Sequence, residues 1–449
     1  MITAGLTDDN DFHYHFLHRS YMRTHMCAFL VRVLTSVHPL ETLMASSAPT
    51  HERQLLWLLA GVQFTHVLDF MILMPLGPEF MRLFGLSAAQ FGAMVSAYTL
   101  ASAVMGLLGA LWLDRLDRKR ALLLLYAGFI TATLACGAAQ SPVWLLLART
   151  VAGASAGLMG AVVMAIIADV VPAERRGRAI GTVMASYGLC AVGGVPLGLW
   201  IASQWGWRAS FWVIGALAGV LWICVLRILP SVARHLTAPG EGSSRSPLAP
   251  LWAPGLPLGW GLTFSVVFAG FLLIPYLSAY MVGNLGLSLA ELPWVYLCGG
   301  AATLLSSRWI GGLIDRHGPA RVLAWLLVGT TVPHLVFTHL TASPLPLVMG
   351  VFVLFMTLTS GRVIPTIALI AARVPPALRG RYLAVNMAAS DGASGLAAWT
   401  SGLMIAAGPD GALIGFGRVG WIAVGVTLFA LCVLRMLGRN APLQSTAPT

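Results

Sequence analysis

Long apolar runs, separated by short basic loops that recur at a nearly fixed offset, most limit what this chain can fold into. The loop LDRLDRKR at 113–120 is matched by GGLIDRHG at 311–318, and PAERRGRA at 172–179 is matched by PPALRGRY at 375–382. The aspartates of the first pair lie 201 positions apart (315 − 114), and arginines of the second pair lie 203 apart (379 − 176). This offset repeat predicts a duplicated membrane protein with two similar halves.

The composition excludes a soluble globular protein. Hydrophobic residues make up 58% of the 449 residues and charged residues only 10%, whereas a soluble domain carries roughly 25% charged residues. The net charge of +11 does not indicate a nucleic-acid partner, because the arginines lie in short loops, with no basic stripe or aromatic reading platform. Excess arginine in short loops instead marks the cytoplasmic side of a membrane.

Twelve apolar runs are long enough to span a bilayer, which needs about 20 apolar residues. We therefore expect an all-α membrane protein with twelve transmembrane helices in two pseudo-symmetric six-helix bundles. The expected spans start near Leu55, Phe91, Ala121, Val143, Ala179, Ser210, Leu258, Pro293, Val322, Leu345, Tyr382 and Arg418. The expected parts are an N-terminal cytoplasmic segment (1–54), a first bundle (55–229), a linker (230–254), a second bundle (255–437) and a cytoplasmic tail (438–449).

The arginine-rich loops and the linker all fall on one side of these spans, which predicts that both termini are cytoplasmic. We expect a multi-pass protein of a bacterial inner (plasma) membrane. The first 44 residues are rich in histidine and contain no span of adequate length. They are read as a disordered segment, as a region before a true start at Met44, or, given the histidines, as a metal-binding tract.

Neither a metal nor a cofactor is expected. The six cysteines are widely separated and form no CxxC or Cys/His cluster, so they are read as small buried hydrophobic residues without disulfides.

Several motifs name a family. The loops 113–120 and 311–318 resemble the Gly-x-x-x-Asp-Arg-x-Gly-Arg-Lys signature of the major facilitator superfamily, although Ala110 and Asp117 stand where the family prefers Gly. ARTVAGASAG in the fourth span resembles the family's intramembrane arginine motif, and GLCAVGGVPLG in the fifth is similar to the Gly/Pro motif of antiporters. The resemblance covers Leu55 to Gly438 and implies the twelve-span drug/metabolite efflux branch.

Asp69 and Arg149 are the first candidates for a functional site. An ionisable residue inside a membrane span is a functional candidate by default, and both residues lie roughly 10–12 Å below the outer surface at 1.5 Å per residue. The resemblance implies that spans one and four line a central cavity, so the two side chains are expected to meet, directly or through water. They form either a proton-coupling site, with His66 one turn away as a possible relay, or a static structural pair.

Three further groups complete the expected site. Arg362 and Asp391 lie at matching depth on hairpin-connected spans and form a second possible pair, which neutralises charge or takes part in transport. Candidate cavity residues are Phe70, Met71, Met74, Tyr98, Phe271, Tyr276 and Tyr280. The repeated Asp-Arg and arginine loops are expected to form a cytoplasmic gate through helix-dipole and charge-assisted contacts; its residues are Asp114, Arg115, Arg118, Arg176, Asp315, Arg316 and Arg379.

The expected function is secondary active efflux of a small amphiphilic compound or drug by alternating access, coupled to protons. The expected partners are this small molecule, protons and the lipid bilayer, with no nucleic acid, and the chain is expected to be a monomer. A sugar or metabolite exporter, coupled or uncoupled, is the alternative within transport. A non-transporting membrane sensor would need a soluble signalling domain, and a membrane enzyme would need clustered His or carboxylates at a membrane face; the sequence offers neither.

Overall fold

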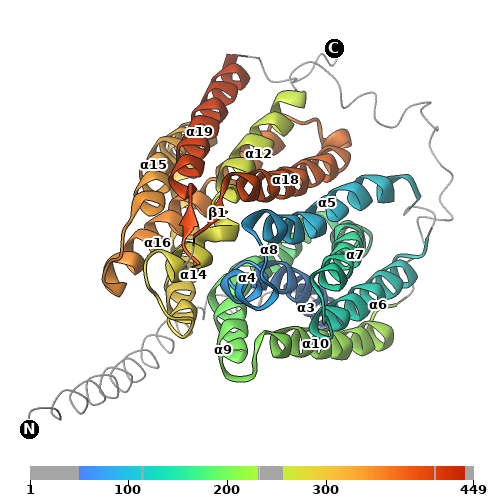
Figure 1. The fold of residues 1–449 in the computed structure, drawn as a ribbon. Coiled ribbons are helices and arrows are strands. Elements are labelled where there is room, and N and C mark those ends of the chain that lie inside the picture. Colours follow the sequence, from blue (N-terminus) through green and yellow to red (C-terminus); the bar gives the residue numbers. More distant parts are fainter. Residues whose placement is uncertain (1–49, 113–115, 231, 233–255, 409–410, 440–449) are drawn as a thin grey trace, which may run out of the picture. The chain divides into compact units, whose positions relative to one another are not determined.

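The computed structural model describes residues 50–112, 116–230, 232, 256–408 and 411–439, and these are helical nearly throughout (Figure 1). The first half contains α3 (Thr50–Ile72), α4 (Gly77–Phe84), α5 (Ala88–Trp112), α6 (Arg118–Gly137), α7 (Pro142–Val170), α8 (Ala173–Leu189), the π-helix η2 (Cys190–Gly194), α9 (Val195–Trp205) and α10 (Trp207–Ile228). Since α8, η2 and α9 form one interrupted span and α4 is short, this half has six spans.

The second half repeats this pattern. It contains α12 (Leu256–Phe271), the 3-10 helix η4 (Ile274–Tyr276), α13 (Leu277–Gly283), α14 (Leu292–His317), α15 (Pro319–His339), α16 (Leu345–Gly361), α17 (Val363–Ala371), α18 (Pro376–Met404) and α19 (Phe416–Arg439). The short strands β1 (Ala406–Ala407) and β2 (Leu413–Ile414) pair antiparallel between α18 and α19. Taking α12–η4–α13 and α16–α17 as interrupted spans, the second half also has six, which confirms the predicted architecture.

The predicted spans correspond to these helices one by one. No predicted start lies more than six residues after the helix start, and the largest differences are at Ala179 against Ala173 and at Tyr382 against Pro376. Ten of the spans among the described residues are long and apolar enough to cross a membrane. The other two, α14 and α18, are continuous helices that contain several glycine and polar residues, which lower their hydropathy. Residues 1–49 of the predicted N-terminal segment 1–54, nearly all of the linker 230–254 and most of the tail 438–449 lie outside the described residues, and residues 50–54 belong to α3.

The two matching loops start their following helices by different means. Gly318 has a φ of +80° between α14 and α15, a backbone conformation that glycine adopts without steric strain. Asp117 occupies the equivalent position in the first loop, has a φ of −56°, and its side chain accepts a hydrogen bond from the backbone N–H of Arg120. Asp117 therefore acts as a helix N-cap, which explains how the first loop departs from the family's glycine.

The buried apolar residues define two ends of the molecule. We call the end with the loops near 116–117, 171–173, 318 and 372–375 the arginine end, and the end with α4 and the β1–β2 hairpin the α4 end. At the α4 end, residues of both halves, such as Phe91 and Tyr276, belong to one continuous hydrophobic cluster. At the arginine end, the first half has its own cluster and the second half has two others. The bundles are thus packed together at the α4 end.

Helices α5 and α18 run side by side between the bundles (Figure 1). Glycines allow this approach: a Cβ at Gly92 on α5 would collide with Tyr276 Oη and with the backbone oxygen of Ala398 on α18. Gly153 on α7 packs in the same way against the backbone of Tyr98 on α5. The small-residue face predicted for the fourth span therefore serves helix packing.

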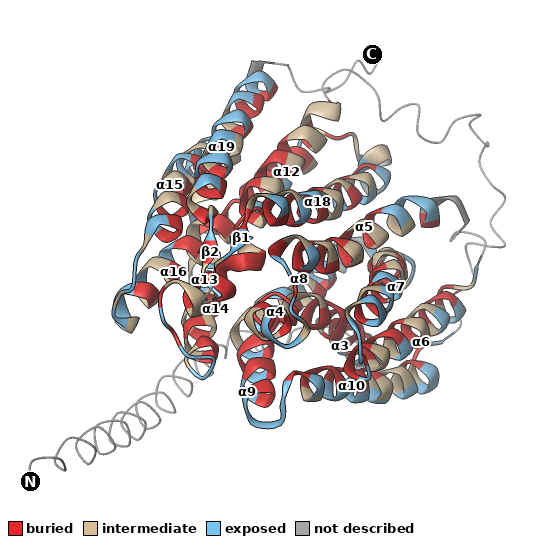
Figure 2. Cartoon of the chain, in the orientation of Figure 1, coloured by how far each residue is buried: buried red, intermediate tan, exposed pale blue. Residues whose placement is uncertain are grey.

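The outward sides of the peripheral helices carry exposed apolar residues (Figure 2). On α10, α15 and α19 these include Trp212, Val220, Val332, Trp421 and Phe429, each between 46% and 60% exposed. Apolar residues exposed all around a protein are stable only against lipid, so this surface is the one that the bilayer covers.

Candidate functional site

A buried ion pair joins α3 to α7 in the first bundle. Arg149 Nη1 lies 2.6 Å from Asp69 Oδ2 and 3.1 Å from the Asp69 backbone oxygen, and neither side chain has exposed surface. Asp69 Oδ1 and Arg149 Nε and Nη2 have no hydrogen-bond partner among the described residues. The predicted contact is therefore confirmed, and it leaves one carboxylate oxygen without a hydrogen bond.

Three aromatic rings connect this pair to the second bundle. The guanidinium carbon of Arg149 lies 4.3 Å from the ring centroid of Tyr98. The Tyr98 ring stacks on Phe70 at 5.4 Å, and Phe70 stacks on Phe271 at 6.1 Å. We call Tyr98, Phe70 and Phe271 the aromatic column. A buried cation–π contact contributes about 2 kcal/mol and an aromatic pair about 0.5–1.5 kcal/mol, so the column is a substantial link between ion pair and interface.

The chain builds this column through local helix geometry. Asp69 and Phe70 are neighbours on α3 and point about 100° apart on the helix, so one presents a carboxylate to α7 while the other presents a ring to the second bundle. Phe271 is the last residue of α12 before that helix breaks.

His66 lies beside this site without joining the ion pair. Its side chain is 9% exposed, its Nε2 has no hydrogen-bond partner among the described residues, and its backbone oxygen accepts from Tyr98 Oη at 3.2 Å. The structure thus places His66 against Tyr98, and its relay role stays a prediction.

Asp391 bonds across the bundle interface. Its Oδ2 accepts a hydrogen bond of 2.6 Å from Ser102 Oγ on α5. One helical turn or more away, Ser96 Oγ donates to the backbone oxygen of Gly395 at 2.6 Å. Ser102 and Ser96 were not among the predicted site residues, because the sequence marks each of them only by a hydroxyl within an apolar span.

The structure does not bring Arg362 and Asp391 together, so their predicted pairing is wrong in this conformation. Arg362 donates from Nε to the backbone oxygen of Thr359 at 3.3 Å and lies within the second bundle. Asp391 instead faces α5 of the first bundle. Equal depth on neighbouring helices did not determine the pairing, because the two side chains point to different sides of their helices.

The predicted cavity residues divide into two sets. Phe70, Met71 and Phe271 are partly buried residues at the edge of the hydrophobic cluster that both bundles share, and Tyr98 lies under Arg149. The others, Met74, Tyr276 and Tyr280, lie in packed contacts and are not placed on a cavity wall. Ser278 Oγ donates to the Met74 oxygen and Tyr276 Oη to the Ala88 and Ala398 oxygens, and Tyr280 Oη donates to the Leu340 oxygen; the break of α12 after Phe271 sets the direction of the two tyrosines.

The predicted gate residues make no cross-bundle ion pair among the part of the chain that the structure describes. Arg118 pairs with Asp169 of its own bundle at 3.5 Å, and Arg176 donates to the backbone oxygen of Val171 at 3.0 Å. Asp315, Arg316 and Arg379 are exposed. Asp114 and Arg115 lie outside the described residues. A gate formed by these groups is therefore still a prediction, and it requires the bundles to meet at the arginine end.

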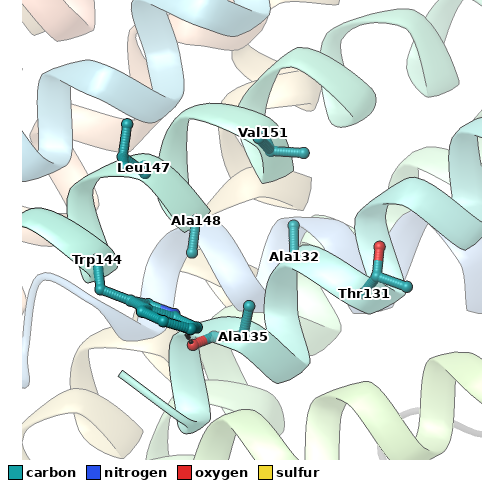
Figure 3. Close-up of a pocket in the computed structure, with 7 residues that line it drawn as sticks. All are labelled: Thr131, Ala132, Ala135, Trp144, Leu147, Ala148 and Val151. Atoms are coloured by element: carbon teal, nitrogen blue, oxygen red, sulfur yellow. Dashed lines mark hydrogen bonds between the residues drawn. The ribbon is translucent and has the colours of Figure 1, made fainter. Parts of the chain in front are cut away.

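A separate groove of about 410 Å³ lies on the outside of the first bundle, between α6 and α7 (Figure 3). Its lining is small and apolar, with Ala132, Ala135 and Ala148 on the floor, and Trp144 Nε1 donates to the Ala135 oxygen at 3.0 Å. Leu147 and Val151 on its rim are 62% and 52% exposed. Since it offers no charged group, we assign this groove to the lipid-facing surface.

Two six-span bundles with charged residues buried beside their interface define a multi-pass membrane transporter. The model of the Major Facilitator Superfamily matches the chain twice, over residues 59–260 and 259–448. The chain belongs to this superfamily, whose members move small molecules across membranes and are not enzymes.

Solved transporter structures share the fold at low sequence identity. A bacterial homolog of the human lysosomal transporter Spinster, in an inward-facing and occupied conformation, is 18% identical, with 90% of this chain and 100% of that chain covered and a TM-score of 0.71. A D-xylose–proton symporter is 16% identical (88% and 98% covered, TM-score 0.67), and the nucleoside transporter NupG is 16% identical (88% and 100% covered, TM-score 0.64). These similarities establish the fold.

Proposed function

We propose that this protein is a proton-coupled efflux transporter of the bacterial inner membrane, which exports a small amphiphilic compound by alternating access. The observation that carries the proposal is the buried Asp69–Arg149 pair and its connection to the second bundle through the aromatic column. Ionisable residues are costly to bury in a membrane, so a pair at this depth is a functional candidate by default.

The proposed coupling follows from what protonation would change. A proton on Asp69 Oδ1, which has no partner among the described residues, removes the charge that holds Arg149. The guanidinium, which also rests on Tyr98, then loses its counter-charge and rearranges. Because Tyr98 stacks on Phe70 and Phe70 on Phe271, the rearrangement changes the contact between bundles. One proton thus biases the equilibrium between two arrangements of the bundles.

The proposed direction rests on two supports. The arginine excess favours a cytoplasmic position for the arginine end, and a conformation closed at the α4 end would then load its compound from inside. In addition, the Gly/Pro segment of the fifth span forms the π-helix η2, which packs against α14 of the other bundle: a Cβ at Gly300 would collide with the Ala191 oxygen. This contact supports closure on the outer side, which an exporter needs to hold its gradient.

Transport by purified protein tests the proposal. A growth-inhibition panel of drugs and sugars, in cells with and without the protein, first identifies an exported compound. Proteoliposomes then measure its accumulation under an imposed pH gradient. We expect Asp69→Asn to mimic the protonated form, retaining binding and facilitated exchange while losing gradient-driven accumulation. Glu79→Gln, which removes a carboxylate on the short helix α4, is the control and should accumulate as the wild type does.

Arg149→Ala should behave differently from Asp69→Asn. It removes the positive charge that favours the ionised carboxylate, so the carboxyl holds its proton more firmly. Release then needs a higher pH, and the optimum of any remaining transport should move upward. Full gradient-driven accumulation by Asp69→Asn would reject the coupling role and leave Asp391 or an uncoupled mechanism as the better explanation.

A further inference from the structure

Arg362 is a buried cation that the ion pair does not explain. Its side chain is 1% exposed and lies where the tenth span is interrupted between α16 and α17. The guanidinium makes one hydrogen bond among the described residues, from Nε to the Thr359 oxygen, and its Nη1 has no partner there. No carboxylate of the described chain pairs with it, in contrast to Arg149, which has Asp69.

A guanidinium does not lose its proton in a protein, so this charge persists in the membrane interior. A buried charge without a counter-charge is strongly destabilising, whereas an apolar residue of similar volume is usually tolerated there. The position would therefore be more stable without the arginine. A cation kept under these conditions indicates an anion that binds when the protein works.

His334 lies near Arg362 and also has an unpartnered polar atom. His334 on α15 has no exposed surface, its Nε2 lies 3.4 Å from Thr359 Oγ1, and its Nδ1 has no partner among the described residues. Arg362 keeps helical backbone angles (φ −66°, ψ −25°) between α16 and α17, so the ends of the two helices meet there and their opposite partial charges largely cancel. Neither His334 nor the backbone therefore supplies the charge that would neutralise Arg362.

Gly270 places this site beside the aromatic column. A Cβ at Gly270 would lie 3.2 Å from Arg362 Nη2 and 3.1 Å from Thr359 Cγ2. The next residue, Phe271, is the ring that stacks on Phe70. Arg362 therefore packs against α12 at the residue next to Phe271, whose partly buried ring belongs to the aromatic column. A ligand with an oxyanion at Arg362 can pack its apolar part against Phe271 and Phe70.

We propose that Arg362 binds the anionic group of the exported compound, which is an organic anion with a carboxylate, sulfonate or phosphate group and an apolar part. The guanidinium offers the parallel N–H donors that suit such oxyanions. The binding claim stands on the geometry around Arg362, and only the claim that the bound compound is exported rests on the proposed function.

Matched amphiphiles test this assignment on the purified full chain in an uncharged detergent. Octanesulfonate and octyltrimethylammonium share their tail and differ in the sign of their charge, and ethanesulfonate and chloride supply an anion without a long tail. Calorimetry and thermal unfolding measure binding. We expect octanesulfonate to bind and to raise the unfolding temperature, and octyltrimethylammonium to bind at least tenfold more weakly. Chloride acting as strongly as octanesulfonate would overturn the organic-anion assignment.

Arg362→Met is the decisive variant. We expect it to weaken octanesulfonate binding at least tenfold, while the unliganded protein keeps or raises its unfolding temperature, because an uncompensated charge has been removed. Arg362→Lys keeps the charge and should retain the preference for the anion with lower affinity. Wild-type octanesulfonate affinity in Arg362→Met overturns the proposal. A second result would also overturn it: a lowered unfolding temperature of Arg362→Met together with no preference for the anion in Arg362→Lys. Both observations would indicate a structural arginine.

Octanoate and octyl phosphate then rank the oxyanions by affinity. Asp69→Asn separates this proposal from the proposed function, because it leaves Arg362 in place and should keep the preference for octanesulfonate over octyltrimethylammonium. If Arg362→Met loses binding while Asp69→Asn still accumulates compound under a pH gradient, the anion site stands and proton coupling at Asp69 fails. If Arg362→Met binds normally and Asp69→Asn loses gradient-driven accumulation, coupling stands and the anion site fails.

Discussion

Arg149 and Arg362 are both fully enclosed by helices, yet their neighbours give them different chemistry. Arg149 has a carboxylate at 2.6 Å and an aromatic ring beneath it, whereas the Arg362 guanidinium has one backbone oxygen as its hydrogen-bond acceptor among the described residues. The depth of each charge in the membrane, counted along its helix, was consistent with the pairing of Asp69 and Arg149 but gave the wrong partner for Arg362. Helical position gives the depth of a side chain, but the direction of that side chain depends on how neighbouring helices are rotated.

The Asp69–Arg149 pair should show strong energetic coupling. Removing one partner alone, as in Asp69→Asn or Arg149→Met, leaves a buried charge unpaired and should cost about 3–5 kcal/mol in the free energy of unfolding. The double variant should be less destabilised than the sum of the two, because it leaves no charge behind. Thermal unfolding in detergent measures all four proteins, and additive losses would mean that the pair contributes no net interaction.

At the scale of helices, interruptions and glycines position the site. Three spans are broken, at η2, at η4 and at Arg362, while α5 approaches both α7 and α18 through glycine contacts. The Gly and Pro of the fifth span were visible in the sequence as a motif, and so was the small-residue face of the fourth. The break in α12, which decides where Phe271, Tyr276 and Tyr280 point, carried only Pro275 as a signal.

Gly153→Ala tests the approach of α7 to α5. The added methyl group collides with the backbone of Tyr98, so the helices must separate, and overpacking of this kind costs about 1–3 kcal/mol. The separation also moves the Tyr98 ring from Arg149. We expect a lower unfolding temperature together with reduced gradient-driven transport.

Gly181→Ala is the matched control, because a Cβ at this position on α8 meets nothing within 4 Å. It should leave stability unchanged or raise it by roughly 0.5–1 kcal/mol, the usual gain from alanine within a helix. Equal behaviour of the two variants would show that close packing at Gly153 is not required.

At the scale of the molecule, the bundles share one hydrophobic cluster at the α4 end and have separate clusters at the arginine end. Two polar cross-contacts are also at the α4 end, where Ser278 Oγ donates to the Met74 oxygen and Tyr276 Oη donates to the Ala88 oxygen, whereas the bond from Ser102 to Asp391 lies midway along α5 and α18. Alternating access would exchange these contacts for a gate at the arginine end, where Asp315, Arg316 and Arg379 are now exposed.

Gly92→Ala should shift this equilibrium. Its methyl group collides with Tyr276 Oη and the Ala398 oxygen, which penalises the arrangement closed at the α4 end and favours the alternative. Spin labels at Leu83 and Leu289, both exposed near that end, should move apart in a cysteine-free background. Gly425→Ala on α19, where a Cβ meets nothing within 4 Å, should leave the distance unchanged. An unaltered distance in folded Gly92→Ala would show that the interface accommodates the methyl group.

The sequence by itself determined the twelve spans and their division into two matching halves, whereas the meeting of Asp69 and Arg149 was expected from their equal depth together with the family resemblance. The spans and halves follow from hydropathy and from the repeated loops, which are local properties, and the depth of the two charges follows from the fixed rise of a helix. Only the tertiary structure decided that Asp391 bonds Ser102 across the interface, that Arg362 has no carboxylate partner among the described residues, and that Phe70 stacks on Phe271. Such contacts depend on helix rotation and on breaks within spans, which arise when close-packed helices from distant parts of the chain settle against one another.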